Sequence, residues 1–387
     1  MQKFYAVFIL CISLHASAQD VQFFQGDWAE TKAKAKAENK MILVDAFTYW
    51  CGPCKMMDKQ LFHNNQEVAD LVNTHFIAFK TECEHDAGLV FARKYKVNAY
   101  PTLLFFNSNG ELLDKQIGFN DDQQAFLADI QKMIDMDQSN TYAMDPNEMV
   151  MPWPDFYVKY FKDANDSTWQ RDRTVDAHAW LDTQQDLFSE TVWAVMYMFN
   201  LNAQYTAYFE AHYAEYQKRY KFEASDKLNH IIYGQMQRSV QEGRPELMQA
   251  AEEKMRTLFP DQPEQILYLQ YSYYQMLGDW TKLAQVFDTF IRDGGKSSLS
   301  LINSVAWTLY EKCNDEGILN MSLTWFDPYL SGITDYNAMD TYAALLFKLK
   351  RYADAEKWAF RAIEQGKKDA FDVQGTEDLL KQIQAGK

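Results

Sequence analysis

The stretch that decides the fold is FTYWCGPCKMMD (47–58), in which Gly52 and Pro53 separate Cys51 from Cys54. It continues MILVDAF (41–47), an apolar run with one acid, which predicts a buried central strand. Pro53 suits the first turn of a helix, so the pattern predicts a strand that leads into a helix beginning at the cysteines. Two cysteines at this spacing are compatible with a redox centre, half of a metal site or a structural disulfide.

The chemistry of the cysteine pair favours the redox interpretation. Structural zinc needs four ligands, and the one other ligand-like run is CEHD (83–86). A disulfide across so short a loop removes little entropy from the unfolded chain. At a helix N-terminus, Cys51 faces unpaired N–H groups, which favour its thiolate. Cys54 lies one turn further and can attack the same sulfur, so Cys51 is predicted as the nucleophile and Cys54 as the resolving thiol.

Composition and charge narrow the possible classes. The chain has 387 residues, 47% of them hydrophobic and 15% aromatic, which predicts a globular protein of two or three domains. Its formal net charge of -16 argues against nucleic acid and anionic membranes as partners. Basic or neutral protein partners stay possible.

The N-terminus predicts export. MQK is followed by the short apolar run FYAVFILCISL and by Ala16-Ser17-Ala18, a small-residue cleavage pattern. We expect residues 1–18 to be a secretory signal, with an uncleaved anchor as the alternative. No later stretch has about 18 uninterrupted apolar residues, so no membrane span is expected after cleavage.

Two types of segment follow each other along the chain. Residues 19–137 predict an α/β domain in the order α, β, α, α, β, α, β, β, α, with a hairpin around Asn109-Gly110. Residues 138–155, rich in proline, predict a linker, and 156–387 predict an all-α domain with aromatic residues at helical spacing. The predicted elements of the α/β part are 26–40, 41–47, 51–62, 67–75, 76–82, 86–97, 102–106, 111–119 and 121–134.

The C-terminal part repeats weakly. Segments 271–291, 304–330 and 340–363 each predict a helical hairpin, with Trp280 and Tyr352 at equivalent positions after the turn and Gly278 matching Lys350. This pattern resembles tetratricopeptide repeats, which stack helical hairpins. The third segment fits best, and its matching residues are Ala343, Tyr352, Ala355 and Ala362.

Residues 26–135 resemble the thioredoxin family, and WCGPCK has that family's active-site form. Asp45, six residues before Cys51, matches the family's buried carboxylate, and Lys80 matches its lysine partner. Tyr100-Pro101-Thr102 matches the cis-proline element and Gly118 a recurring glycine. The run after Cys54 is similar to the exported subgroup near the C-terminal domain of DsbD-type reductases. The resemblance implies a mixed sheet flanked by helices, ahead of the helical-repeat domain.

For the chemistry, the resemblance implies that Asp45 accepts a proton from Cys54, while a structural pairing of Asp45 with Lys80 is the alternative. Gly52, Pro53 and Lys80 would support the site. No metal and no cofactor is expected besides the redox-active disulfide.

The resemblance also implies how a substrate is held. Pro101 in cis would leave the backbone of Tyr100 free to pair with an extended substrate strand beside Cys51, and Trp50 would wall the sulfur. Tyr100 departs from the small or β-branched residue usual before this proline in cytosolic thioredoxins, so the resemblance predicts the fold but not the substrate preference.

These observations predict an exported, periplasmic thiol–disulfide oxidoreductase that reduces disulfides of protein substrates. Its electron donor would be a membrane reductase, and its helical domain would recognise partners. An isomerase or oxidase is the alternative, as is an adaptor that keeps the thioredoxin domain as scaffold. Cys83 and Cys313 are expected to be buried thiols, and a bond between them is the other possibility.

Overall fold

The computed structural model describes residues 20–119, 122–171, 177–260, 262–295 and 298–386, so the predicted signal at 1–18 lies outside the described residues. Contacts divide the chain into two compact units, one ending at Leu228 and the other beginning at Asn229. Each unit is built around its own core.

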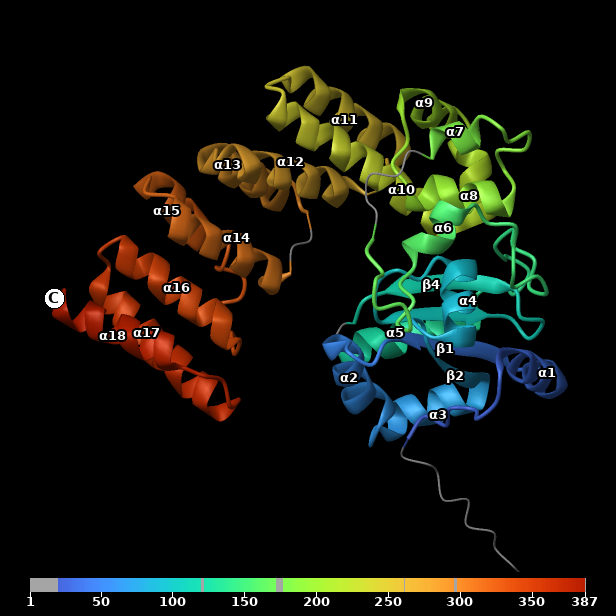
Figure 1. Ribbon diagram of the computed structural model, residues 1–387. Helices are drawn as coiled ribbons and strands as arrows, with labels where there is room; N and C mark the ends of the chain where they lie inside the picture. Colours follow the sequence, from blue (N-terminus) through green and yellow to red (C-terminus); the bar gives the residue numbers. More distant parts are fainter. Residues whose placement is uncertain (1–19, 120–121, 172–176, 261, 296–297, 387) are drawn as a thin grey trace, which may run out of the picture. The chain divides into compact units, whose positions relative to one another are not determined.

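The first unit contains a four-stranded mixed sheet flanked by helices, which confirms the predicted fold class (Figure 1). The strands lie in the order β2-β1-β3-β4; β1 pairs in parallel with β2, and the other pairs are antiparallel. The elements are α1 (Trp28–Glu38), β1 (Met41–Phe47), α2 (Gly52–Met57), the π-helical turn η1 (Asp58–Phe62), α3 (Gln66–His75), β2 (Phe76–Glu82), α4 (Asp86–Tyr95), β3 (Thr102–Phe106), β4 (Leu112–Ile117) and α5 (Gln123–Asp135). Their order is the predicted one.

Local signals explain where these elements begin and turn. Asp27 and Glu30 form a reciprocal capping box at the start of α1. Gly110, with a φ of 80°, makes the turn between β3 and β4 that the Asn109-Gly110 pair predicts. These contacts lie close together in the sequence, which is why sequence patterns reveal them.

The sheet buries a different set of side chains on each face. On one face Trp28 of α1 packs against Phe91 of α4 and Phe106 of β3. On the other face Leu43 of β1 belongs to a core cluster with residues of α2, α3 and α5, among them Met57. Because strand residues alternate between faces, Asp45 lies on the same face as Leu43 and α2.

The first unit extends beyond the predicted linker. Its further helices are α6 (Asp155–Tyr160), α7 (His178–Leu181), α8 (Glu190–Met198), α9 (Ala203–Ala211) and the beginning of α10 (Tyr213–Gln241), which is kinked at Lys221. Glu223 of α10 is fully buried, lies 2.8 Å from the Nζ of Lys115 on β4 and 3.3 Å from that of Lys96, and accepts a hydrogen bond from Trp193 of α8. These contacts explain why the contact boundary falls at Leu228, whereas composition changes at 138–155.

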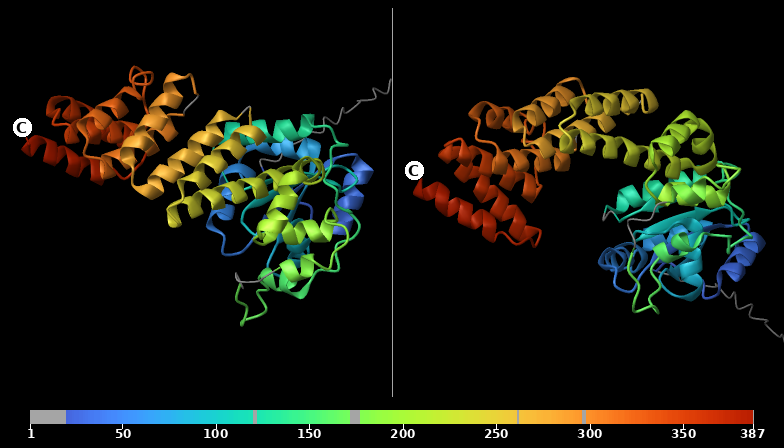
Figure 2. Two further views of the ribbon diagram at one scale, coloured as in Figure 1. Left: turned by 90° about the horizontal axis from the view of Figure 1, so that it is seen from above. Right: turned by 45° about the horizontal axis from the view of Figure 1, so that its top comes forward.

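The second unit is helical. It contains the rest of α10 and then α11 (Pro245–Leu258), α12 (Pro263–Leu277), α13 (Trp280–Arg292), α14 (Leu299–Lys312), α15 (Glu316–Thr324), α16 (Tyr336–Lys348), α17 (Tyr352–Lys368) and α18 (Gln374–Ala385), and Figure 2 shows how they follow each other. The three predicted hairpins correspond to α12–α13, α14–α15 and α16–α17.

The turns of the first and third hairpins are alike. Gly278 and Lys350 both have positive φ values, 68° and 59°, and Trp280 and Tyr352 each begin the following helix. The helical hairpins are therefore observed, and their assignment to the tetratricopeptide type stays a prediction.

Candidate active site

Cys51 and Cys54 form a disulfide where β1 leads into α2. Cys51 is the N-cap of α2, and its sulfur accepts a hydrogen bond from the backbone N–H of Cys54 at 3.1 Å. Both residues are almost fully buried, at 2% and 4% exposure. When the bond is reduced, the same N–H donor and the helix N-terminus favour the thiolate of Cys51.

Asp45 provides a buried carboxyl group on the strand before the cysteines. It is 1% exposed, and its Oδ1 has no hydrogen-bond partner among the described residues. Burial raises the pKa of Asp45 to about 6, against the opposing effect of the Lys80 ammonium. A carboxyl group with a pKa near 6 can exchange protons at neutral pH, as a general acid or base must.

Lys80 connects Asp45 to the surface. It is the register partner of Asp45 across β1 and β2, and its Nζ lies 3.5 Å from Asp45 Oδ2. Its Nζ also contacts Asp58 of η1, and Asp58 lies 3.3 Å from His63 Nε2. The charge of Asp58 adds to the rise of the Asp45 pKa. The pairing of Asp45 with Lys80 that the resemblance implies is present, whereas the roles of Asp58 and His63 were not predicted.

The predicted substrate-binding residues lie at one end of the sheet. The Tyr100–Pro101 peptide bond is cis, and the carbonyl of Pro101 accepts a hydrogen bond from Gly118 N–H at 2.9 Å. Trp50 is 63% exposed, and its ring meets the ring of Tyr100 edge to face at 6.0 Å. The segments around the cysteines and the cis-proline therefore lie side by side.

Glu84 holds Trp50 in place and was not predicted to do so. Its carboxylate accepts a hydrogen bond from Trp50 Nε1 at 2.9 Å and from Lys162 Nζ at 3.0 Å. Glu84 belongs to the CEHD run that the sequence offers as a candidate ligand cluster, but the side chains of this run make separate contacts: His85 pairs with Glu82. Among the described residues, no group of three or more His, Cys, Asp or Glu side chains is placed to hold a metal ion.

The two remaining cysteines that lie among the described residues are buried free thiols, as expected. Burial raises the pKa of the Cys83 thiol well above its ordinary value, so Cys83 is a poor nucleophile. Cys313 belongs to the core of the second unit. Within the described residues, no helix is long and apolar enough to cross a bilayer.

Together, the sheet, the disulfide at the start of α2 and the cis-proline define the class of the first unit: a thioredoxin fold with an intact dithiol site. The sequence profile of the Thioredoxin family matches residues 24–132. Thioredoxin H4 of Arabidopsis thaliana is 33% identical over 99 residues, which are 25% of this chain and 77% of that protein. The chain therefore belongs to the thioredoxin family through this part.

Other matches cover the same part. The thiol:disulfide interchange protein DsbD of Pseudoalteromonas atlantica is 29% identical over 85 residues, which are 22% of this chain and 14% of that protein. A putative disulphide-isomerase from Bacteroides thetaiotaomicron, known in solution structure, has 36% identity and a TM-score of 0.28 over 32% of this chain and 99% of that one. This chain thus spans a small part of the DsbD protein. The thioredoxin domain with its Cys51–Cys54 pair supports thiol–disulfide oxidoreductase activity.

Proposed function

We propose that this protein is an exported thiol–disulfide oxidoreductase that reduces disulfides in protein substrates. The observation that carries the proposal is the placement of Cys51 as the N-cap of α2, with an N–H donor on its sulfur and a buried carboxyl group of raised pKa on the preceding strand. A scaffold without redox function has no need of a buried, partly unpaired acid, which costs stability.

The reaction uses two thiols and one proton acceptor. The thiolate of Cys51 attacks one sulfur of the substrate disulfide; a mixed disulfide forms, and the other substrate sulfur leaves as a thiolate. Cys54 then gives its proton to Asp45 and attacks the Cys51 sulfur, which releases the second substrate thiolate. The substrate gains two electrons, and the protein is left with the Cys51–Cys54 disulfide.

The protein must be reduced again before the next cycle. In an oxidising compartment such as a bacterial periplasm, two electrons have to come from a donor, for which a membrane reductase is our proposal. The similarity to a thiol:disulfide interchange protein supports dithiol exchange as the donor chemistry, and the signal pattern at residues 1–18 supports the choice of compartment. An isomerase or oxidase is the second candidate, because the same dithiol chemistry runs in both directions.

Mixed-disulfide trapping tests the assignment of the two cysteines. In the protein lacking residues 1–18, Cys54→Ser should accumulate substrates bound to Cys51, because the resolving thiol is missing. Cys51→Ser should lower the rate of insulin reduction by on the order of 10³-fold or more and should trap nothing. Trapping by Cys51→Ser and not by Cys54→Ser would reverse the two roles.

We also propose that the helical region selects partners. Stacked helical hairpins usually present a surface for binding other proteins. A fragment of residues 19–228 keeps the first compact unit with its buried ion pairs. This fragment should reduce insulin at nearly the rate of the longer protein and should lose most trapped partners when it carries Cys54→Ser. If the fragment traps the same partners, residues 229–387 do not select them. The alternative role as an adaptor would require that the protein binds partners and reduces no disulfide.

A further inference from the structure

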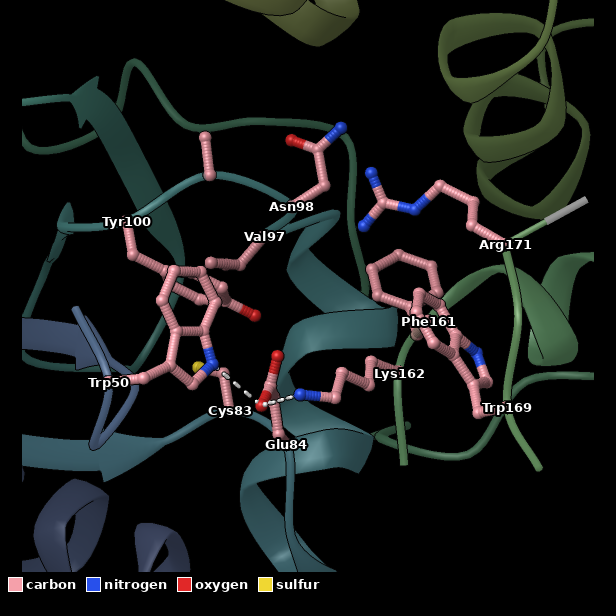
Figure 3. Close-up of a pocket in the computed structure, with 11 residues that line it drawn as sticks. Trp50, Cys83, Glu84, Val97, Asn98, Tyr100, Phe161, Lys162, Trp169 and Arg171 are labelled. Atoms are coloured by element: carbon pink, nitrogen blue, oxygen red, sulfur yellow. Dashed lines mark hydrogen bonds and ion pairs between the residues drawn. The ribbon is translucent and has the colours of Figure 1, made fainter. Parts of the chain in front are cut away.

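A cavity of about 390 Å³ lies beside the candidate active site in the first unit (Figure 3). One wall is formed by Trp50, which precedes Cys51, and by Tyr100, which precedes Pro101. A substrate whose disulfide reaches Cys51 therefore passes the mouth of this cavity. Its volume is at the lower end of the range for ligand pockets and fits one or two side chains.

The opposite wall comes from outside the part of the chain that the thioredoxin profile matches. It is formed by Phe161, Lys162, Trp169 and Arg171, which follow α6. The segment is tied to the thioredoxin part, because Ala164 N–H donates to the carbonyl of Glu84 at 2.8 Å. This wall is therefore attached to the thioredoxin part within the first unit.

The cavity carries two cations and one anion among its lining residues. The anion, Glu84, is shared by Lys162 and Trp50, at 3.0 and 2.9 Å, so its charge is compensated. Arg171 has no hydrogen bond or ion pair with a described residue, and its Nε is buried without a partner among them. Its guanidinium lies over the rings of Tyr160 and Trp169, at 4.8 and 5.7 Å from their centroids.

When aromatic rings lie against the face of a guanidinium, the N–H groups at its edge stay available to bind an anion. A guanidinium binds a carboxylate through two parallel hydrogen bonds, which makes it more selective for this group than a lysine. Figure 3 shows the Arg171 side chain reaching toward the wall that carries Asn98 and Val97. In a chain of formal net charge -16, a cavity whose arginine has no counter-charge among the described residues is a favourable place for an acidic group to bind.

We propose that this cavity binds an acidic side chain of the substrate polypeptide, close in sequence to the cysteine that Cys51 attacks, through the guanidinium of Arg171. The proposal rests on the proposed reductase function and names its substrate preference. Trp50, Tyr100 and Trp169 contact the apolar part of the same substrate segment. Arg171 is thus a specificity residue and takes no part in the transfer of electrons.

Matched peptides test this assignment. In a set of disulfide-linked peptides, a single Glu is placed in turn at each position from three residues before to three residues after the cysteine, and each peptide has a partner with Gln at that position. The protein lacking residues 1–18 should reduce the Glu peptide faster by about tenfold or more at one or two of these positions. The difference should shrink with added salt, because a partly exposed ion pair is screened.

Variants then assign the effect to Arg171. Arg171→Gln should remove the preference for Glu, and Arg171→Glu should replace it with a preference for Lys at the same position. Arg244→Gln, on an exposed arginine of the second unit, is the matched control and should keep the wild-type preference. Equal rates for Glu and Gln peptides at every position, or an unchanged preference in Arg171→Gln, would overturn the assignment.

The failures of the two proposals differ. If the wild-type protein reduces insulin and the peptides without any Glu preference, only the role of the cavity is refuted. If it reduces no disulfide at all, the reductase function is refuted and the proposed preference falls with it. Equal wild-type rates for the Glu and Gln peptides refute the role of the cavity without any variant, so this outcome does not depend on whether a substitution at Arg171 impairs folding.

Discussion

Two regions of the first unit bury a carboxyl group, and they shift its pKa in opposite directions. Asp45, below the cysteines, is 1% exposed and has an unpartnered oxygen, and burial raises its pKa to about 6. Glu223, beneath the helices, is 0% exposed. Burial alone would raise the pKa of Glu223, but Lys115, Lys96 and the hydrogen bond from Trp193 outweigh burial and hold it below its ordinary value.

The opposite pKa shifts indicate a structural role for Glu223 and a role in proton transfer for Asp45. A carboxylate with two buried cations and an indole donor is satisfied in its charged form, so it stabilises the packing of α10 on the sheet. A carboxyl group left with one partly exposed lysine can change its protonation state near neutral pH, so it can serve a proton transfer. Removal of the negative charge should therefore destabilise one region and stabilise the other.

The largest effect is expected for Glu223→Gln. The substitution leaves Lys115 and Lys96 buried without a counter-charge, which should lower the free energy of unfolding of the first unit by about 3–5 kcal/mol. Hydrogen exchange of the β1 and β3 amides at pH 7 reports this change. A loss below about 1 kcal/mol would show that the pair is not a main support of the unit.

Asp45→Asn should have the opposite sign. In the wild-type protein the folded pKa of Asp45 lies above the unfolded value, so the folded state binds the proton more tightly and loses stability as pH rises from about 3.8 through about 6. At pH 7 the amide should therefore stabilise the unit by on the order of 2–3 kcal/mol, and the dependence over this pH window should disappear.

The same substitution should impair the reaction. Without a proton acceptor for Cys54, thiol exchange above neutral pH should slow by about 10²-fold. Single-turnover measurements of how fast the substrate is released from the mixed disulfide report the rate of this step. An unchanged rate, together with the expected gain in stability, would reduce Asp45 to the structural pairing with Lys80.

Smaller effects are expected from the neighbours of Asp45. Lys80→Met removes the cation that lowers the pKa of Asp45, so the pH profile of thiol exchange should move to higher pH. Asp58→Asn removes a negative charge that raises this pKa and should move the profile to lower pH. Profiles that move in the same direction for both variants would contradict this electrostatic account of the site.

The smallest effect is expected at an exposed ion pair. Glu246 forms a pair with Arg244, and both side chains are more than half exposed. Glu246→Gln should leave the midpoint of thermal unfolding unchanged, because solvent screens such a pair. A destabilisation comparable to that of Glu223→Gln would mean that burial is not what separates the two regions.

The cysteine pair and the strand before it were predictable because their signals are local. Asp45, Lys80 and the Tyr100-Pro101 element were assigned through the resemblance to the thioredoxin family. The structure places Asp45 and Lys80 in register on β1 and β2, and the Tyr100 ring against Trp50, which precedes Cys51. The β3–β4 turn is local as well, and its prediction is confirmed.

The region around Glu223 was not predictable in this way. Its partner Lys115 is 108 residues away, and a single lysine in a strand carries no sign of its partner. One signal was present in the sequence: Tyr216, Tyr220 and Glu223 follow helical spacing, and all three are fully buried. An acid within an aromatic stripe predicts a buried charge, but only the folded chain shows which lysines meet it.

The reduction potential of the Cys51–Cys54 pair tests the central claim most directly. A reductant should have a potential near that of thioredoxin, about -270 mV, whereas a strong oxidant such as DsbA lies near -120 mV. Equilibration of the protein lacking residues 1–18 with glutathione or dithiothreitol buffers, followed by mass spectrometry of the alkylated thiols, gives the value. A potential below about -240 mV is predicted, and a potential above about -180 mV would contradict the proposed role as a reductant.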